Sequence, residues 1–213
     1  MRYGGAGMKS EICLIRHGIT EGNKLGVYYG AVDIPLLDEG IEELTSLRDR
    51  GTYPQYENPE FYTSGMLRTE QTLETIYGQR PHRQIELLRE YNFGEFEMRH
   101  HRDIKELDEY QAFVKDREGY VAPPGGECAR DFVKRVAEGF NELKVSHYQH
   151  VLRIRNEEKM ASSVAVIHGG VIAAIMDSCW PDEKDWFFKW TPDPGHGYIL
   201  TLEDGGIQEY REF

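Results

Sequence analysis

The chain has 213 residues, 39% hydrophobic and 29% charged, so it is long enough to bury a core of its own. Its 37 acidic residues against 25 basic ones give a net charge of −12. General binding to nucleic acid or to anionic lipid favours the opposite charge, so we expect neither a nucleic-acid nor a membrane partner. An anionic ligand therefore needs a local cationic pocket set against an acidic background.

The cysteines and the N-terminus indicate the compartment. Cys13, Cys128 and Cys179 are odd in number and widely spaced, which favours free thiols in a reducing compartment. No apolar run is long enough to span a membrane, and residues 1–7 (MRYGGAG) lack the apolar core of a secretory signal. We expect a cytoplasmic protein with a flexible leader at 1–7 and a single domain over 8–213.

The first half of the chain alternates short apolar runs with amphipathic stretches. Residues 12–15 indicate a buried strand that Gly18 ends, and residues 38–51 predict a helix with Asp38 as its cap. The same patterns predict a strand over 60–64, a helix over 65–78 and a third strand over 83–90.

Residues 91–125 interrupt this pattern, because they are irregular and rich in charged and aromatic residues. We expect a small helical excursion there, with one or two helices around residues 102–116. A long helix follows, and its predicted apolar face consists of Phe132, Val133, Val136, Phe140 and Leu143.

The C-terminal part supplies the clearest strand, SSVAVIHGG (162–170), with an apolar helix over 171–180 behind it. Residues 196–213 predict a hairpin that turns at DGG. Strands that alternate with helices favour an α/β fold with a mostly parallel central sheet and helices on both faces.

Two of the apolar runs, ICLIRHG and VAVIHGG, end in the same way, with a histidine followed by glycine. Ligands of open parallel sheets bind outside the carboxyl ends of the strands. We therefore expect His17 and His168 to share one pocket at this edge. Arg16, Arg68 and Glu90 also follow predicted strands, so we expect them at the same edge.

This set of side chains suits phosphoryl transfer. Guanidinium groups match phosphate oxygens bidentately, and a neutral imidazole can attack phosphorus. Nearby arginines favour the neutral form of the imidazole. A carboxylic acid can protonate the leaving oxygen and then activate a water. Fixed cations neutralise the phosphoryl oxygens, so the pattern requires no metal and no other cofactor.

The stretch LIRHGITEGN resembles the LxRHGxTxxN signature of the histidine phosphatase superfamily, also called the phosphoglycerate-mutase-like family. Four further blocks resemble the family in the family's order: TSGMLRTEQT, LREYNFGEFE, PPGGEC and VIHGG. The resemblance as a whole covers most of the chain. The resemblance implies a phosphoglycerate-mutase-like fold in which residues 91–125 form a lid.

The resemblance also implies a role for each matching residue. His17 is the nucleophile that forms a phosphohistidine, and Glu90 is the proton donor. Thr20 matches the signature too, and its hydroxyl either bonds a phosphate oxygen or braces the loop. The residues implied to bind the phosphoryl group are Arg16, Asn23, Arg68 and His168.

Two residues depart from the family pattern. Cys128 stands where the family usually has serine, which predicts a weakly capped helix. Met98 stands where a glycine often follows the position of Glu97. Other histidines carry no metal prediction: the adjacent pair at 100–101 points to different sides, and His147 and His150 are expected on the surface.

The acceptor of the phosphoryl group distinguishes the possible reactions. The excursion is short, about 35 residues, which favours a phosphatase acting on a small phosphorylated metabolite. A sugar phosphate, phosphoglycerate and α-ribazole phosphate are the candidate substrates, and Arg99, His100 and Arg102 are expected at the entrance. A phosphoglycerate mutase with the same phosphohistidine is the alternative. An inactive phospho-ligand-binding protein is disfavoured because the catalytic set is intact, and a homodimer stays open as the assembly.

Overall fold

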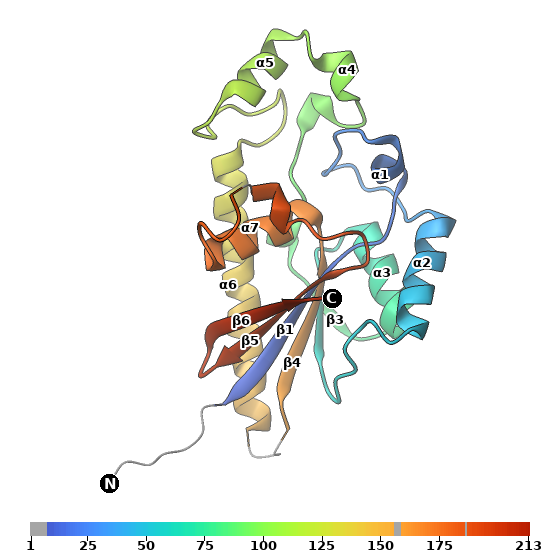
Figure 1. The fold of residues 1–213 in the computed structure, drawn as a ribbon, viewed down its shortest axis with the longest axis vertical. Helices are drawn as coiled ribbons and strands as arrows, with labels where there is room; N and C mark the ends of the chain where they lie inside the picture. Colours follow the sequence, from blue (N-terminus) through green and yellow to red (C-terminus); the bar gives the residue numbers. More distant parts are fainter. Residues whose placement is uncertain (1–7, 156–158, 186) are drawn as a thin grey trace.

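The computed structural model describes residues 8–155, 159–185 and 187–213 (Figure 1). The expected leader at 1–7 lies outside these residues. One six-stranded sheet runs in the order β3-β2-β4-β1-β5-β6, with β4 beside β1 in parallel register. Its strands are β1 (Lys9–Arg16), β2 (Glu60–Thr63), β3 (His82–Gln84), β4 (Ala161–Ile167), β5 (Gly197–Glu203) and β6 (Gly206–Glu212).

The mostly parallel α/β sheet predicted from the sequence is confirmed. Strands β3, β2, β4 and β1 are parallel, whereas β5 and β6 form the predicted antiparallel hairpin. Every residue of β4 is buried, because helices cover both faces of this central strand. The longer helices are α2 (Asp38–Asp49), α3 (Leu67–Tyr77), α5 (Asp108–Lys115), α6 (Ala129–Ile154) and α7 (Gly169–Cys179).

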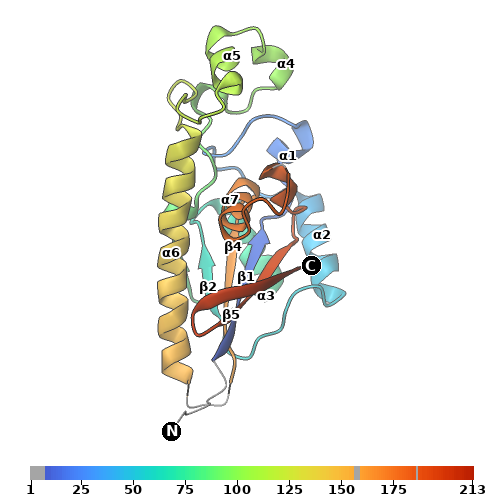
Figure 2. The same ribbon diagram turned by 60° about the vertical axis from the view of Figure 1, so that its left-hand side comes forward.

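Alternate residues of β1 supply the two halves of the core. Ile12 and Leu14 pack with residues of α6 and α7, and Cys13 and Ile15 pack with residues of α2 and α3. Figure 2 shows α6 and α2 on opposite sides of the sheet. Because successive side chains of β1 point to opposite faces of the sheet, helices pack on both faces, as the sequence predicted.

The predicted strand over 83–90 is wrong beyond Gln84. Strand β3 ends there, and residues Glu86–Leu88 form a short 3-10 helix, η1. Ile85 and Leu88 are both buried, and their spacing of three fits a 3-10 turn rather than the two-residue period of a strand. The segment that carries Glu90 is therefore an irregular loop after η1.

The predicted long helix is present as α6, but its buried face differs from the prediction. It continues to Ile154, so its inner face extends beyond Leu143 at helical spacing and reaches His147 and His150, which are buried. The prediction of surface histidines is therefore wrong. Val133 is exposed, because it lies one position away from the inward-facing Phe132. Cys128 begins the helix without a side-chain cap, as expected.

Helix α2 begins one residue earlier than predicted. Leu37 is its cap residue and has no side-chain acceptor for the free N–H groups of the first turn, so Asp38 is not the cap. Asp38 instead lies in the first turn, where its carboxylate interacts favourably with the positive end of the helix dipole.

Residues 91–125 stand beyond the carboxyl ends of the parallel strands, next to α1 (Glu21–Leu25), as Figures 1 and 2 show. They contain η2 (Gly94–Phe96), α4 (His101–Ile104) and α5, so the expected helices are present. Phe96, Ile104 and Tyr110 form a small core of their own. Within the residues described, no helix combines the length and apolarity needed to cross a bilayer.

Candidate active site

The turns after β1 and β4 bring two buried histidines together. The backbone N–H of His17 donates to the carbonyl of Ile167 at 3.0 Å, so the parallel pairing continues past the ends of the strands. The rings of His17 and His168 lie edge to face with their centroids 5.2 Å apart. The structure therefore places both histidines in one pocket, as the repeated HG pattern predicted.

His17 is held by a single contact. Its Nδ1 lies 2.7 Å from the carbonyl oxygen of Gly18, which can only accept, so Nδ1 carries the proton and Nε2 keeps a lone pair. Burial, and then the charges of Arg68 and Arg16, lower the pKa of His17 well below its usual value. The ring is therefore neutral, and Nε2 can act as a nucleophile.

His168 has both ring nitrogens engaged. The Nε of Arg68 donates to its Nδ1 at 3.3 Å, so the proton lies on Nε2 and is donated to Ser64 Oγ at 2.8 Å. Burial, and then the nearby charges of Arg68, His17 and Arg16, also lower the pKa of His168 well below its usual value. This ring is neutral as well, but it is oriented by its partners.

Arg68 lies in the first turn of α3 and is fully buried. Its Nη2 donates to the carbonyl of Gly30 at 2.6 Å and its Nη1 to the carbonyl of Val32 at 3.0 Å. With Nε on His168, all three nitrogens of the guanidinium have a protein partner. The loop around Gly30 thus fixes the position of this cation.

Glu97 holds the same loop from its other side. Its carboxylate accepts hydrogen bonds from the backbone N–H groups of Gly30, Ala31 and Val32 at 2.9, 3.0 and 3.3 Å. The N–H of Phe93 donates to it as well, at 2.9 Å. The peptide groups of residues 30–32 therefore link the carboxylate of Glu97 to the guanidinium of Arg68.

Arg16 ends β1 and reaches the segment that follows α7. Its Nη1 donates to the carbonyl of Pro192 at 2.7 Å, whereas its Nε is buried and has no partner within the described residues. A Cβ on Gly169 would lie 3.1 Å from this Nε, so the glycine permits the close approach. The guanidinium thus retains donors that no described residue of the protein uses.

Glu90 lies at the N-terminus of α7, next to His168. Its Oε2 accepts from the backbone N–H of Gly170 and its Oε1 from that of Tyr91, both at 2.9 Å. A Cβ on Gly170 would come within 2.6 Å of Oε1, so a side chain there would displace the carboxylate. Glu90 thus reaches the predicted edge, although a loop delivers it and not a strand.

Thr20 and Asn23 form the capping box of α1. Asn23 Oδ1 accepts from the N–H of Thr20 at 3.0 Å and from the hydroxyl of Tyr29 at 2.9 Å. The buried Thr20 hydroxyl lies 3.0 Å from the same Oδ1, so its contacts brace the loop. The amide nitrogen of Asn23 has no hydrogen-bond partner among the residues described.

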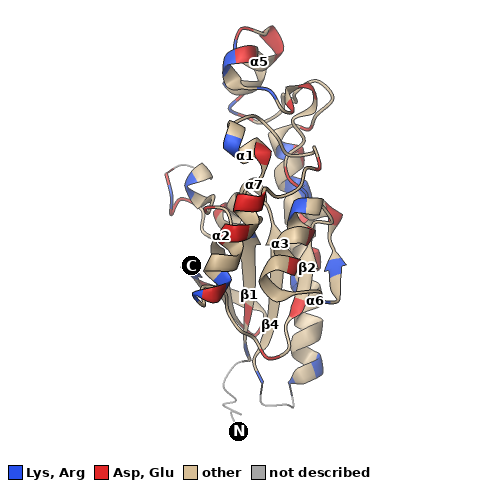
Figure 3. Cartoon of the chain, turned by 90° about the vertical axis from the view of Figure 1, so that its right-hand side faces the viewer, with Lys and Arg blue, Asp and Glu red and all other residues tan. Residues whose placement is uncertain are grey.

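Arg99 and Arg102, expected at the entrance, contact the segment 91–125 itself. Arg99 donates to the carbonyl of Asp103 at 3.4 Å, and Arg102 lies 3.8 Å from its carboxylate. His100 precedes α4 and is half-buried. Along the ribbon in Figure 3, basic and acidic residues are interspersed.

The known proteins similar to this chain agree with the geometry. The model of the histidine phosphatase superfamily (branch 1) matches residues 12–211. The chain belongs to this superfamily.

Two relatives and one solved structure illustrate the range of this histidine phosphatase superfamily. The adenosylcobalamin/alpha-ribazole phosphatase of Escherichia coli is 30% identical over 184 residues, which cover 84% of each chain. A 2,3-bisphosphoglycerate-dependent phosphoglycerate mutase of Bartonella henselae is 28% identical, with 79% of this chain and 81% of that protein covered. The crystal structure of the alpha-ribazole phosphatase from Shigella flexneri is 25% identical, has a TM-score of 0.75, and covers 93% of both chains.

Sequence reasoning missed several residues of this superfamily member's site. Ser64 and Glu97 lie inside matching blocks, so the blocks themselves were a signal, but no role followed from their type. Gly30 and Tyr29 carried no signal, because they act through a backbone carbonyl and through a ring 5.3 Å below the Arg68 guanidinium carbon.

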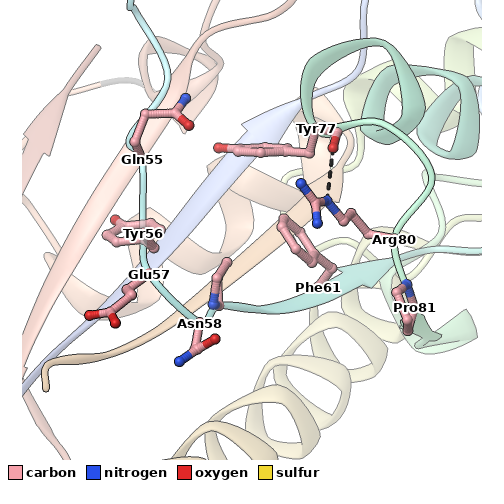
Figure 4. A pocket seen from close by; sticks show the side chains of 9 residues that line it. Gln55, Tyr56, Glu57, Asn58, Phe61, Tyr77, Arg80 and Pro81 are labelled. Carbon is pink, nitrogen blue, oxygen red and sulfur yellow. Dashed lines mark hydrogen bonds between the residues drawn. The ribbon is translucent and has the colours of Figure 1, made fainter.

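A cavity of about 310 Å³ opens elsewhere, at the amino ends of β2 and β3 (Figure 4). The rings of Tyr56, Phe61 and Tyr77 line it together with Arg80, whose Nε donates to the carbonyl of Tyr77 at 2.9 Å. It contains none of the residues described above. Among the described residues, no group of three or more His, Cys, Asp or Glu is arranged to hold a metal ion.

Proposed function

We propose that this protein is a phosphomonoesterase that hydrolyses a small phosphorylated metabolite through a phosphohistidine at His17. The observation that carries the proposal is the tautomer of His17. Its Nδ1–H is fixed on the Gly18 carbonyl, which leaves the lone pair of Nε2 available in a ring that burial keeps neutral. Membership of the histidine phosphatase superfamily supports the same reaction.

In the first half of the reaction, His17 Nε2 attacks phosphorus and the ester P–O bond breaks. Glu90, protonated at this stage, donates its proton to the leaving alcohol oxygen. The imidazole gains positive charge as the N–P bond forms, and the Gly18 carbonyl on Nδ1–H stabilises that charge. In the second half, a water gives its proton to Glu90, attacks phosphorus and breaks the N–P bond.

Two guanidinium groups supply positive charge for the transferred phosphoryl group. We assign this role to Arg16 and Arg68, with the amide nitrogen of Asn23 as a further donor. His168 joins them when its Nε2–H passes from Ser64 Oγ to a phosphoryl oxygen. The buried Nε of Arg16 supports the assignment, because it has no partner in the described part of the chain and a phosphate oxygen would supply one. Thr20 then acts by bracing Asn23. Since these cations are fixed in place, the proposed reaction needs no metal ion.

α-Ribazole phosphate is the first substrate to test, because two relatives that match most of the chain are named as phosphatases of this compound. A phosphoglycerate mutase is the second candidate, supported by the mutase relative from Bartonella henselae. The short segment 91–125 favours hydrolysis, since a mutase must keep water away from the phosphohistidine. The buried, unpaired Cys13 and Cys128 support a cytoplasmic location.

The deciding experiment is a panel of phosphomonoesters assayed with a chelator present. We expect phosphate release together with an acid-labile phosphoenzyme, both of which are lost in His17→Ala. Wild-type turnover in His17→Ala, or a requirement for added divalent metal, would overturn the mechanism. Conversion of 3-phosphoglycerate to 2-phosphoglycerate without phosphate release would assign the mutase reaction instead.

A further inference from the structure

Glu90 lies in an irregular loop, whereas Arg68 lies in a helix and His17 and His168 directly follow strands. The loop that carries it, residues 89–93, runs from η1 to η2. Its carboxylate accepts hydrogen bonds from the backbone N–H groups of Tyr91 and Gly170, and these bonds fix only the end of the side chain. The backbone of this loop must therefore be held by other groups.

A single guanidinium on α6 holds it. Arg135 Nη1 donates to the carbonyls of Leu87 and Arg89 at 2.8 and 2.9 Å. Its Nη2 lies 3.3 Å from the carbonyl of Glu90 itself. Three carbonyls within the four residues 87–90 thus converge on one cation, which anchors the loop to a 26-residue helix.

Glu127 completes the arrangement from a position two residues before the first residue of α6. Its carboxylate pairs with Arg135 through two bonds, 2.6 Å to Nη2 and 3.2 Å to Nε. It also accepts from the N–H of Asn92 at 2.9 Å. The side chains of Glu127 and Arg135 are only 18% and 23% exposed, so solvent weakens this pair less than it weakens surface pairs. Arg135 and Glu127 therefore fix the loop on both sides of Glu90.

From this geometry we propose that Arg135, paired with Glu127, is a positioning residue for proton transfer by Glu90. The inference rests on the proposed function, because it requires Glu90 to protonate the leaving oxygen. Proton transfer depends on distances of a few tenths of an ångström, so a loosened loop lowers the rate of this step in particular. A purely structural role would instead lower the amount of folded enzyme and affect every substrate equally.

The dependence of the rate on the leaving group separates the two roles. An alkyl phosphate needs the proton of Glu90 when its P–O bond breaks, whereas p-nitrophenyl phosphate releases a stable anion and needs it far less. We would compare kcat/KM for both esters, since this constant reports the steps up to loss of the alcohol. The ratio of the two constants does not depend on how much of the enzyme is folded.

The variants are Arg135→Met and Arg135→Lys, with Glu90→Gln as the reference and Arg130→Met as the matched control. Arg130 lies on the same helix but contacts the exposed Tyr120. We expect Glu90→Gln to lower the alkyl constant by ~100-fold and the aryl constant by less than ~10-fold. Arg135→Met should lower the alkyl constant by ~10-fold with the aryl constant within ~3-fold, and Arg135→Lys should recover part of the loss. Arg130→Met should leave the ratio unchanged.

Two outcomes would overturn different claims. If Glu90→Gln changes the ratio and the Arg135 variants lower both constants equally, Arg135 is structural and the proposed function stands. If the wild type forms no phosphoenzyme, or Glu90→Gln leaves the ratio unchanged, the proposed function fails first. In the double variant Glu90→Gln/Arg135→Met, the ratio should equal that of Glu90→Gln alone, and a further fall would contradict positioning through Glu90.

Discussion

The turn after β1 and the turn after β4 are neighbours that share the dipeptide His-Gly, yet they hold their histidines differently. His17 is fixed through one nitrogen by the adjacent Gly18 carbonyl, and its other nitrogen stays available. His168 is fixed through both nitrogens by Ser64 and Arg68, which come from the segment after β2. A strand that ends in HG thus delivers an imidazole to the site, while its partners decide what the imidazole can do.

The two histidines are held differently because their turns contact different neighbouring segments. The backbone N–H of Gly18 donates to the Thr72 hydroxyl, so α3 holds the turn of His17 without touching its ring. The ring of His168 instead ends a chain of contacts that runs through Arg68 and the loop 30–32 to Glu97. The turn after β1 therefore presents a ring with an available nitrogen, whereas the ring after β4 is held by a network of hydrogen bonds.

Replacing His17 by alanine should lower turnover far more than replacing His168, and this difference is the largest effect we expect. His17→Ala should lower turnover by at least ~10⁴-fold and abolish the phosphoenzyme, because the covalent route is lost. His168→Ala should cost ~10²–10³-fold and still form the phosphoenzyme slowly, because it removes a binding group only. Phosphate release measures turnover, and labelling of the enzyme by a radioactive phosphate ester measures the phosphoenzyme in each variant. Equal losses of the phosphoenzyme in the two variants would contradict the division of roles.

The second largest effect we expect concerns the hydrogen bonds that link Glu97 through residues 30–32 to Arg68 and His168. Glu97→Gln replaces an acceptor of four backbone N–H groups by a side chain with only one acceptor oxygen, so residues 30–32 and then Arg68 should shift. We expect orthovanadate, an analogue of the transferred phosphoryl group, to bind ~10-fold more weakly. The matched control is Glu95→Gln, two residues away and exposed.

Equal vanadate affinity in Glu97→Gln and Glu95→Gln would show that the loop does not transmit the position of Glu97 to Arg68. A double variant with Arg68→Ala adds a second check. Once Arg68 is absent, Glu97→Gln should weaken vanadate binding no further.

The sequence predicted the two histidine turns well because their information is local. A buried apolar run, a histidine and a glycine recur within seven residues, and parallel strands bring such ends together. Arg16, Arg68 and Glu90 were placed at the correct edge too. The tautomer of His17 and the orientation of His168 could not be predicted, since both depend on the packing of segments far apart in sequence.

The failures share the same cause. His147 was predicted to lie on the surface because no Cys or paired carboxylate accompanies it in the sequence. Its Nδ1 in fact lies 2.8 Å from Ser163 Oγ on β4. Glu90 appeared to follow a strand because LLRE is apolar enough for one. Its real support, Arg135, lies 45 residues further along the chain, at a distance where residue type gives no pairing information.

The pH dependence tests what the two turns share. Both imidazoles have a pKa well below the usual 6.5, through burial first and Arg68 second, so both stay neutral as the pH falls through 6.5. Activity on an aryl phosphate should therefore persist through this range and decline only at lower pH. Stability has the same sign: it is fully present above the unfolded pKa and is lost as the pH falls toward the folded values, because the unfolded chain binds protons first.

Histidine NMR titration provides the direct measurement. The signals of His17 and His168 should stay at their neutral positions at pH 6, and in Arg68→Gln both pKa values should rise toward 6.5. Signals that titrate near 6.5 in the wild type would contradict the neutral pair on which the nucleophile depends.

The smallest effect concerns Met98, next to Glu97 at the far end of the network. Its φ of +58° is a left-handed conformation that costs a residue with a side chain ~1 kcal/mol, and glycine avoids this cost. Met98→Gly should therefore unfold at a higher urea concentration than the control Met98→Ala, which removes similar contacts but keeps the Cβ. We expect a difference of ~1 kcal/mol and vanadate affinities within twofold of each other. If the glycine variant is more stable but binds vanadate more weakly, the strained backbone itself helps to press Glu97 against residues 30–32, and the network of His168 begins one residue further away than its hydrogen bonds indicate.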